Sequence, residues 1–198
     1  MAGMARIVDP GELARAALPV EADLDGGPWD IDATDGDVTG GASAVGDDEC
    51  LPPDFPEDEV AAAGDITFEH RRGHRLVHAT STVFATPAAA SRAAAMLEAE
   101  PFVRCFMTSV AATVEVAPPV ELLGPVVAPQ GSCGWRAVLA AVEDDAVSSI
   151  TVDVGVLRRD VVVLLVWSVR SSSRGGDQAW DRLIERARHR CDEAVGSV

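Results

Sequence analysis

The stretch from Ser148 to Arg170 constrains the fold more than any other part of the sequence. Its first half alternates apolar residues with small or polar ones, which is the period of a strand with one buried face. Its second half, Val161 to Trp167, is apolar at every position; it is too short to cross a bilayer as a helix and rich in β-branched residues. Charged residues between the halves suit a surface turn. This stretch predicts an antiparallel hairpin whose second strand lies deep in a sheet.

Capping signals and apolar periods predict the elements that precede this hairpin. Thr86 and Pro87 form a strong helix start, because threonine can cap a helix and proline fits its first position. Glycine at Gly73 supplies the positive φ angle of a tight turn between two strands. The predicted elements are a helix over residues 9–18, strands from Ile66 to His70 and Arg75 to Phe84, and helices from Thr86 to about Ala99 and from Pro101 to about Thr113.

The segments after residue 113 are harder to assign. We expect a short strand from Val114 to Val116 and a loop from Pro118 to Gly134. The segment from Trp135 to Val142 fits a helix and a strand equally well, and we choose a strand because the hairpin needs partners. A final helix opens at Asp177 and carries one apolar stripe. Its stripe consists of Trp180, Leu183, Ile184, Ala187, Cys191, Ala194 and Val195.

These elements predict an α+β fold, a mostly antiparallel sheet with helices packed on one face and stapled by two disulfides. The chain of 198 residues is long enough for one well-packed domain. Within that domain, we expect residues 1–64 to form a helix and a long acidic, mostly irregular segment, and residues 65–195 to form the α+β core.

Charge is distributed unevenly and limits the possible partners. The formal net charge is −16, and residues 16–70 hold 16 of the 32 acidic residues and no arginine. A basic groove for nucleic acid and attraction to anionic lipid are therefore not expected. The sequence contains no run of about 18 apolar residues, so a transmembrane helix is not expected. The remaining partner classes are a small molecule or another protein.

Four cysteines at wide spacing fit two disulfides in an oxidising compartment, and there is no Cys-x-x-Cys motif of a zinc or redox site. We predict bridges between Cys50 and Cys105 and between Cys133 and Cys191, because 105 and 191 lie on apolar helix faces while 50 and 133 lie in loops. The rival pairing joins 105 to 191 and 50 to 133. The first ten residues lack a signal-peptide core, which leaves an exported protein whose leader was removed, or a cytosolic protein with four thiols. The cysteines favour export.

No catalytic, cofactor-binding or metal-binding motif is recognisable. His70, His74 and His78 recur every four residues, but Gly73 breaks the segment, so we expect polar hairpin residues and no structural metal. The acidic run over 30–37 resembles a calcium loop but lacks the required register and the closing glutamate. There is no nucleophile elbow, no phosphate loop and no distinct acid–base pair, which predicts a protein that is not an enzyme.

Several features follow one another in a characteristic order along the chain. They are the runs 17–24 and 26–29, Cys50, the strand 77–84, the Ala-rich helix ending in 101–105, the Leu-Leu-Gly at 122–124 and the hairpin 153–166. This order is similar to that of actinobacterial cell-envelope proteins, many of them lipoproteins, and of the extracellular sensor domains of PknH-type serine/threonine kinases. The resemblance covers about residues 17–195. It implies an antiparallel sheet flanked by helices, disulfides, and a ligand- or partner-binding role without catalytic residues.

Three functional hypotheses follow. The first is a non-catalytic extracytoplasmic binding or sensing domain of unknown ligand. The second is a small hydrolase-like enzyme whose site is built from scattered residues, and convergent polar groups in a pocket would favour it. The third is a cytosolic interaction protein with reduced thiols.

Overall fold

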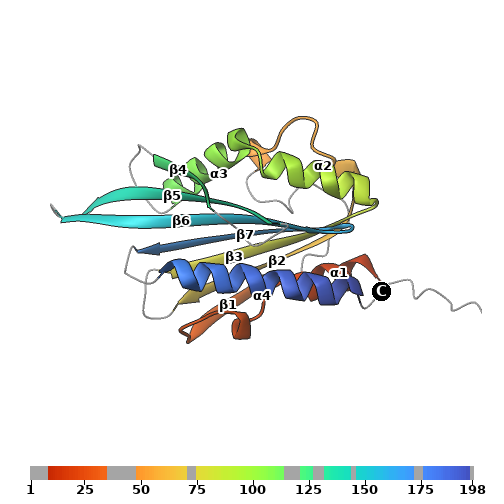
Figure 1. Cartoon of the computed structure of the whole chain (residues 1–198), viewed down its shortest axis with the longest axis horizontal. Helices are drawn as coiled ribbons and strands as arrows, with labels where there is room; N and C mark the ends of the chain where they lie inside the picture. The colour runs from red at the N-terminus through yellow and green to blue at the C-terminus, as the bar shows by residue number, and fades with distance from the viewer. Residues whose placement is uncertain are drawn as a thin grey trace, which may run out of the picture.

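The computed structural model describes residues 9–34, 48–70, 75–113, 121–126, 132–143, 146–171 and 176–196. Its centre is a seven-stranded sheet in the order β1-β2-β3-β7-β6-β5-β4, with every neighbouring pair antiparallel (Figure 1). The strands are β1 (Trp29–Thr34), β2 (Val60–His70), β3 (Arg75–Phe84), β4 (Glu121–Val126), β5 (Ser132–Glu143), β6 (Ala146–Arg159) and β7 (Val162–Ser171). The described helices are α1 (Pro10–Ala17), α2 (Pro87–Leu97), α3 (Glu100–Thr113) and α4 (Gly176–Gly196).

The predicted hairpin is confirmed as β6 and β7, which are central strands of the sheet. The turn between them lies at Asp160 and Val161, and Asp160 adopts a positive φ of 47°. The strand assignment of the segment after Trp135 is also confirmed, because it forms β5 and pairs with β6 along its whole length. Periodicity and the need for a partner strand were therefore sufficient to place this part of the sheet.

Helices cover both faces of the sheet, so the prediction of helices on one face is wrong. Val163 and Leu165 of β7 belong to a cluster with α2 and α3, whereas Val162 and Leu164 belong to a cluster with α1 and α4. We call these two sides the α2 face and the α4 face. Successive side chains of a strand point to opposite faces. A strand that is apolar at every position therefore needs apolar cover on both sides.

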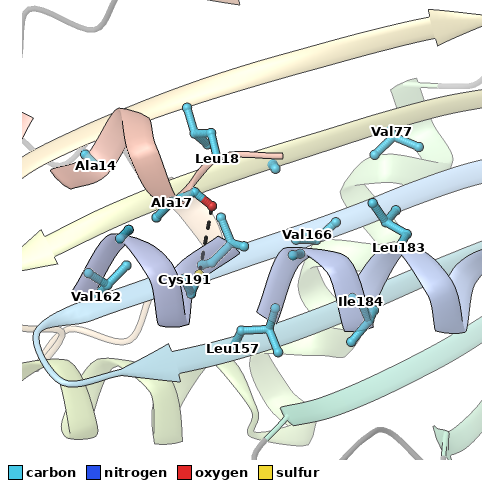
Figure 2. Packing of buried hydrophobic residues seen from close by; sticks show 14 of the residues in the cluster. Ala14, Ala17, Leu18, Val77, Leu157, Val162, Val166, Leu183, Ile184 and Cys191 are labelled. Carbon is cyan, nitrogen blue, oxygen red and sulfur yellow. Dashed lines mark hydrogen bonds between the residues drawn. The ribbon is translucent and has the colours of Figure 1, made fainter. Parts of the chain in front are cut away.

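The α4 face is packed around the apolar stripe of the last helix (Figure 2). Trp180 and Ile184 are buried, and Gly155 of β6 lies directly beneath them, where a larger residue would meet both side chains. The same stripe contacts α1, whose helix begins at the capping side chain of Asp9. In α1 the buried alanines are 14 and 17, whereas Ala16 is exposed.

Residues 48–59 form a strap on the α2 face that is fixed at several points. A disulfide joins Cys50 to Cys105 of α3, with their Cα atoms 5.5 Å apart, which is the first predicted bridge. Phe55 packs edge-on against Phe84 at 6.2 Å between ring centroids. At the other end, the carboxylate of Glu59 binds Arg92 of α2 and Thr86, the residue that caps that helix. The disulfide spans 55 residues, for which the chain-entropy estimate is about 4 kcal/mol.

Several predicted boundaries need correction. Residues 29–34, expected to be irregular, form the edge strand β1, and β2 begins at Val60 rather than at Ile66. The predicted loop from 118 to 134 contains β4, while the strand predicted at 114–116 lies outside the described residues. Short edge strands with glycine, proline and aspartate carry weak periodic signals, which explains why β1 and β4 were missed.

Replacing Gly155 by alanine tests the close packing of α4 on the sheet. An added Cβ would lie 2.8 Å from Cδ1 of Ile184 and 3.1 Å from Cζ2 of Trp180, and both side chains are buried. We expect G155A to lower the free energy of unfolding by about 1–3 kcal/mol in urea titrations.

The matched control is Gly64→Ala in β2, whose added Cβ would meet Leu18 at an ordinary 3.6 Å. We expect G64A to be near neutral, within about 1 kcal/mol of the native chain. Equal losses in the two variants would contradict this packing.

Candidate functional site

Four side chains on the α2 face form one row across four neighbouring strands. Asp32 of β1 lies opposite Thr67 of β2, Thr67 opposite His78 of β3, and His78 opposite Trp167 of β7. We call this set the His78 row. Side chains directly opposite each other in an antiparallel pair have Cβ atoms about 4.5–5.5 Å apart, so each member lies beside the next. Asp32 is exposed, and the other three are half-buried.

His78 is held on both sides by threonine hydroxyls. Its Nδ1 lies 2.8 Å from Oγ1 of Thr67, and its Nε2 lies 3.1 Å from Oγ1 of Thr80. Burial lowers the pKa of His78 below its ordinary value of 6.5, and the negative charge of Asp65 offsets part of this effect. The ring is therefore neutral at neutral pH, with one nitrogen donating and the other accepting. Because both nitrogens are engaged, it is poorly placed to act as a general base.

Aromatic rings surround the β7 end of the row. The rings of His78 and Trp167 lie 5.4 Å apart between centroids, and Phe106 of α3 packs edge-on against Trp167 at 6.0 Å. Phe106 in turn stacks on Phe102 at 5.6 Å. These contacts fix the indole from two sides while leaving it half-buried. The row thus ends on a rigid, partly accessible aromatic surface.

Carboxylates surround the other end of the row. Asp32 lies directly opposite Thr67, and Asp65 and Glu69 lie two residues before and after Thr67 on the same strand face. Asp30 lies opposite Glu69. Every charged side chain that the described parts of β1, β2 and β3 place on the α2 face is acidic. This end of the row is therefore an acidic surface.

Helices leave this part of the α2 face less covered than the rest. α2 packs on β3, β6 and β7, and α3 packs on β5, so the main helical cover lies away from β1 and β2. In Figure 1, α2 and α3 lie toward the β4–β5 side of the sheet, while α1 and α4 cross the β1–β3 side. The His78 row therefore runs from helix-covered strands to a strand at the sheet edge.

On the α4 face, arginines of β3, β5 and β7 gather around one buried acid. The carboxylate of Asp153 is fully buried and accepts hydrogen bonds from Arg136 and from Arg170, whose Nη2 lies 3.2 Å away. Arg75 lies opposite Arg170, and burial together with that positive neighbour lowers the pKa of Arg75. Removing one member of such a network leaves a buried charge uncompensated, at a typical cost of about 3–5 kcal/mol. This cluster is best explained as structural.

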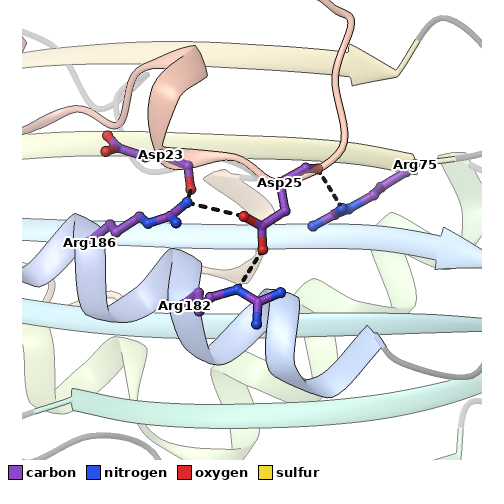
Figure 3. Close-up of polar contacts among 5 residues, drawn as sticks. All are labelled: Asp23, Asp25, Arg75, Arg182 and Arg186. Carbon is purple, nitrogen blue, oxygen red and sulfur yellow. Dashed lines mark hydrogen bonds and ion pairs between the residues drawn. The ribbon is translucent and has the colours of Figure 1, made fainter.

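A second charged cluster clamps the segment after α1 onto α4 (Figure 3). Arg182 binds the carboxylate of Asp25 at 2.6 Å, Arg186 binds the same carboxylate and the backbone oxygen of Asp23, and Arg190 binds the Asp23 carboxylate at 2.8 Å. The hydrogen bond from Arg182 lowers the pKa of Asp25. The acidic segment is therefore held in part by the arginines that lie outside the apolar stripe of the last helix.

The three histidines singled out from the sequence do not converge in the described structure. His70 lies on the α4 face, where it packs against Trp29 at 5.1 Å and contacts the backbone oxygen of Gly26. His78 lies on the α2 face, and His74 lies outside the described residues. No group of three or more His, Cys, Asp or Glu side chains in the described ranges is placed to hold a metal ion. Asp30 and Asp32 lie in a strand rather than in a loop.

The second predicted disulfide, Cys133 with Cys191, is wrong. Cys191 is a free thiol buried under α1 on the α4 face, where its Sγ lies 3.9 Å from the backbone oxygen of Ala17 (Figure 2). Cys133 lies in β5 opposite Val156, which packs in the α2-face cluster; the side chain of Cys133 is not described. Burial raises the pKa of Cys191 to about 12. The sequence showed that this cysteine points inward, but not which face of the sheet its helix covers.

Sequence reasoning also missed most of the His78 row. Trp167 was assigned to the core as the last residue of an apolar run, and Thr67 and Thr80 were not singled out. Asp32 was considered only as part of the rejected calcium loop. The signal that could have found them is strand register, since pairing β2, β3 and β7 places these residues side by side. Register follows from turn geometry and partner choice, which a single strand does not reveal.

Comparisons with known proteins returned solved structures only: no protein-family model and no curated protein matches the chain. The crystal structure of the extracellular domain of PknH from Mycobacterium tuberculosis is similar, with a TM-score of 0.49 and 10% identity over 94% of this chain and 100% of that chain. LpqN, involved in cell envelope biogenesis of the same organism, has a TM-score of 0.30 and 10% identity over 85% and 83%. Both are cell-envelope or extracellular proteins of the kind to which the sequence was found to be similar.

The lowered pKa of His78 predicts a pH dependence of stability. Between the native pKa and the unfolded value of 6.5, the unfolded chain binds more protons at this residue than the native protein does. The contribution of neutral His78 to stability is therefore complete above pH 6.5 and is lost as the pH falls below that value. We expect the fall in unfolding free energy from roughly pH 7 to pH 5 to be smaller in His78→Gln than in the native chain.

The matched control is His189→Gln, because His189 is exposed on α4. Urea titrations at several pH values compare the three proteins. If the H78Q protein loses stability on acidification as steeply as the native chain, the lowered pKa of His78 is not the cause of the pH dependence.

Proposed function

We propose that this protein is a non-catalytic ligand- or partner-binding domain of the cell envelope, and that it binds through the His78 row. The observation that carries the proposal is a row of aromatic, histidine, threonine and carboxylate side chains that runs onto a part of the α2 face with little helical cover. A surface that combines a rigid aromatic ring with fixed polar groups is typical of recognition sites.

The side chains of the described residues favour binding over catalysis. Both nitrogens of His78 are engaged by threonines, and the buried thiol of Cys191, with its pKa of about 12, is not a nucleophile at neutral pH. The buried carboxylate of Asp153 is neutralised by two arginines. A hydrolase-like site would need a base or nucleophile that is free to react.

The disulfide supports an extracytoplasmic location over the cytosolic alternative. The bridge from Cys50 to Cys105 fixes the strap of residues 48–59 to α3, and Cys105 is exposed, so reducing agents have access to it. Structural disulfides persist in oxidising compartments. None of the described helices has the length and apolar character required to cross a bilayer.

Nuclear magnetic resonance tests the proposed site. The intact chain is titrated with a fragment set that contains cationic, neutral and anionic compounds, and the four indole N–H signals are followed. We expect binding fragments to shift the signal of Trp167 and to leave those of Trp29 and Trp180, buried on the α4 face, unchanged.

Thr67→Val serves as the site variant, since it removes one hydroxyl from His78 and nearly preserves volume. Thr108→Val, on the exposed side of α3, is the matched control. We expect T67V to weaken binding by roughly three- to tenfold and T108V to leave it unchanged. Fragments that shift only signals of the α4 face, or turnover of a fragment abolished by one substitution, would contradict the proposal.

A further inference from the structure

We propose that the natural ligand of the His78 row is an organic cation with an apolar end and an ammonium group, lying across β7, β3 and β2. This inference rests on the proposed function and adds the chemical class of the ligand. It follows from the different character of the two ends of the row, one aromatic and the other acidic.

The aromatic end suits the apolar part of such a ligand. Trp167 is half-buried and is held by His78 and by Phe106, so its ring is fixed before a ligand arrives. A preorganised ring binds an apolar or aromatic group without a large cost in side-chain entropy. A neutral His78 beside it adds aromatic surface without the positive charge that would repel a cation.

The acidic end suits the ammonium group. Asp32, Asp65 and Glu69 surround Thr67, and arginines are confined to the α4 face among the charged residues described on β1, β2, β3 and β7. The negative charge of these carboxylates attracts a cation above Thr67 and repels an anion. The Thr67 hydroxyl can also accept a hydrogen bond from an ammonium group.

The geometry also sets the length of the ligand. Two strand spacings separate Trp167 from Thr67, and neighbouring strands lie about 4.8 Å apart, so the apolar and charged groups are about 10 Å apart. A ring joined to an ammonium group by a chain of several methylenes fits this span. A compact cation would reach only one of the two ends.

Three probes of one shape and three charges test the inference. These are 4-phenylbutylammonium, 4-phenylbutan-1-ol and 4-phenylbutanoate, titrated into the intact chain while the Trp167 indole signal is followed. We expect the ammonium compound to bind roughly tenfold more tightly than the alcohol and the carboxylate to bind most weakly. Raising the salt concentration should weaken binding of the ammonium compound more than that of the alcohol.

Two charge-matched variants separate local from global electrostatics. Asp32→Asn with Asp65→Asn changes the net charge by two at the site, and Glu12→Gln with Glu185→Gln makes the same change at exposed positions of α1 and α4. We expect the first pair of substitutions to weaken binding of the ammonium compound by roughly fivefold or more and the second pair to have little effect on it. Trp167→Leu should weaken binding of all three probes. Because this variant lacks the indole signal, its binding is measured from the signals of the ligands.

The outcomes distinguish this inference from the proposed function. Equal affinity for the ammonium compound and the alcohol, preference for the carboxylate, or equal losses in the two double variants would overturn the cation assignment. If fragments of other charge shift Trp167 while the ammonium probe does not bind, the binding site stands and the ligand class is wrong. If no fragment of any charge shifts Trp167, the proposed function itself fails.

Discussion

The structure depends on the burial of β7 on both faces. Val162 to Val166 are all buried, with alternate side chains packed under α2 and α3 and under α1 and α4. Each buried aliphatic side chain contributes about 1.5–3 kcal/mol relative to exposure, so a strand of this composition stabilises the fold only if both faces are covered. The sheet is therefore the middle layer of three. Its central strands are covered on both sides, while the outer strands receive helical cover mainly on one.

The charged residues are also divided between the two faces of the sheet. Residues 16–70 contain no arginine, and two of their acids, Asp23 and Asp25, bind arginines of α4 on the α4 face. Exposed ion pairs of this kind are individually weak, but several of them act together on one short segment. On the other face, the acids of β1 and β2 lie beside His78 and away from these arginines. The two faces of the β1–β3 half of the sheet therefore have opposite electrostatic character, and only the acidic face has little helical cover.

Local patterns in the sequence predicted much of this fold. The hairpin β6–β7, the capped start of α2 at Thr86 and the apolar stripe of α4 follow from periodicity and capping, and the structure contains all three. The pairing of Cys50 with Cys105 was also predicted from the need to anchor a loop, although Cys105 was expected on the apolar face of its helix and is exposed. The arrangement of layers did not, although the uninterrupted apolar run of β7 already required cover on both faces. With helices on both faces, Cys191 of α4 lies on the α4 face, whereas Cys133 of β5 is paired with Val156 of the α2-face cluster, and the second disulfide does not form.

The His78 row depends on information that one sequence does not contain. Its members come from strands that are distant in the chain, and they meet only through the register of three strand pairs. A one-residue slip in any of these pairs would place Asp32 or Trp167 on the other face. Propensity and composition are insensitive to such a slip, so from the sequence the acidic segment was expected to be mostly irregular and no site was predicted there.

Hydroxyl-radical footprinting tests most directly the central claim that the aromatic end of the His78 row is accessible on the α2 face. Oxidation of each tryptophan is measured by mass spectrometry on the native chain. The structure leaves Trp167 half-buried, whereas Trp29 and Trp180 on the α4 face are 3% and 4% exposed. The account predicts that Trp167 is oxidised several times faster than either of them. A Trp167 protected as fully as Trp29 and Trp180 would contradict it, because the surface proposed to bind a ligand would then be closed.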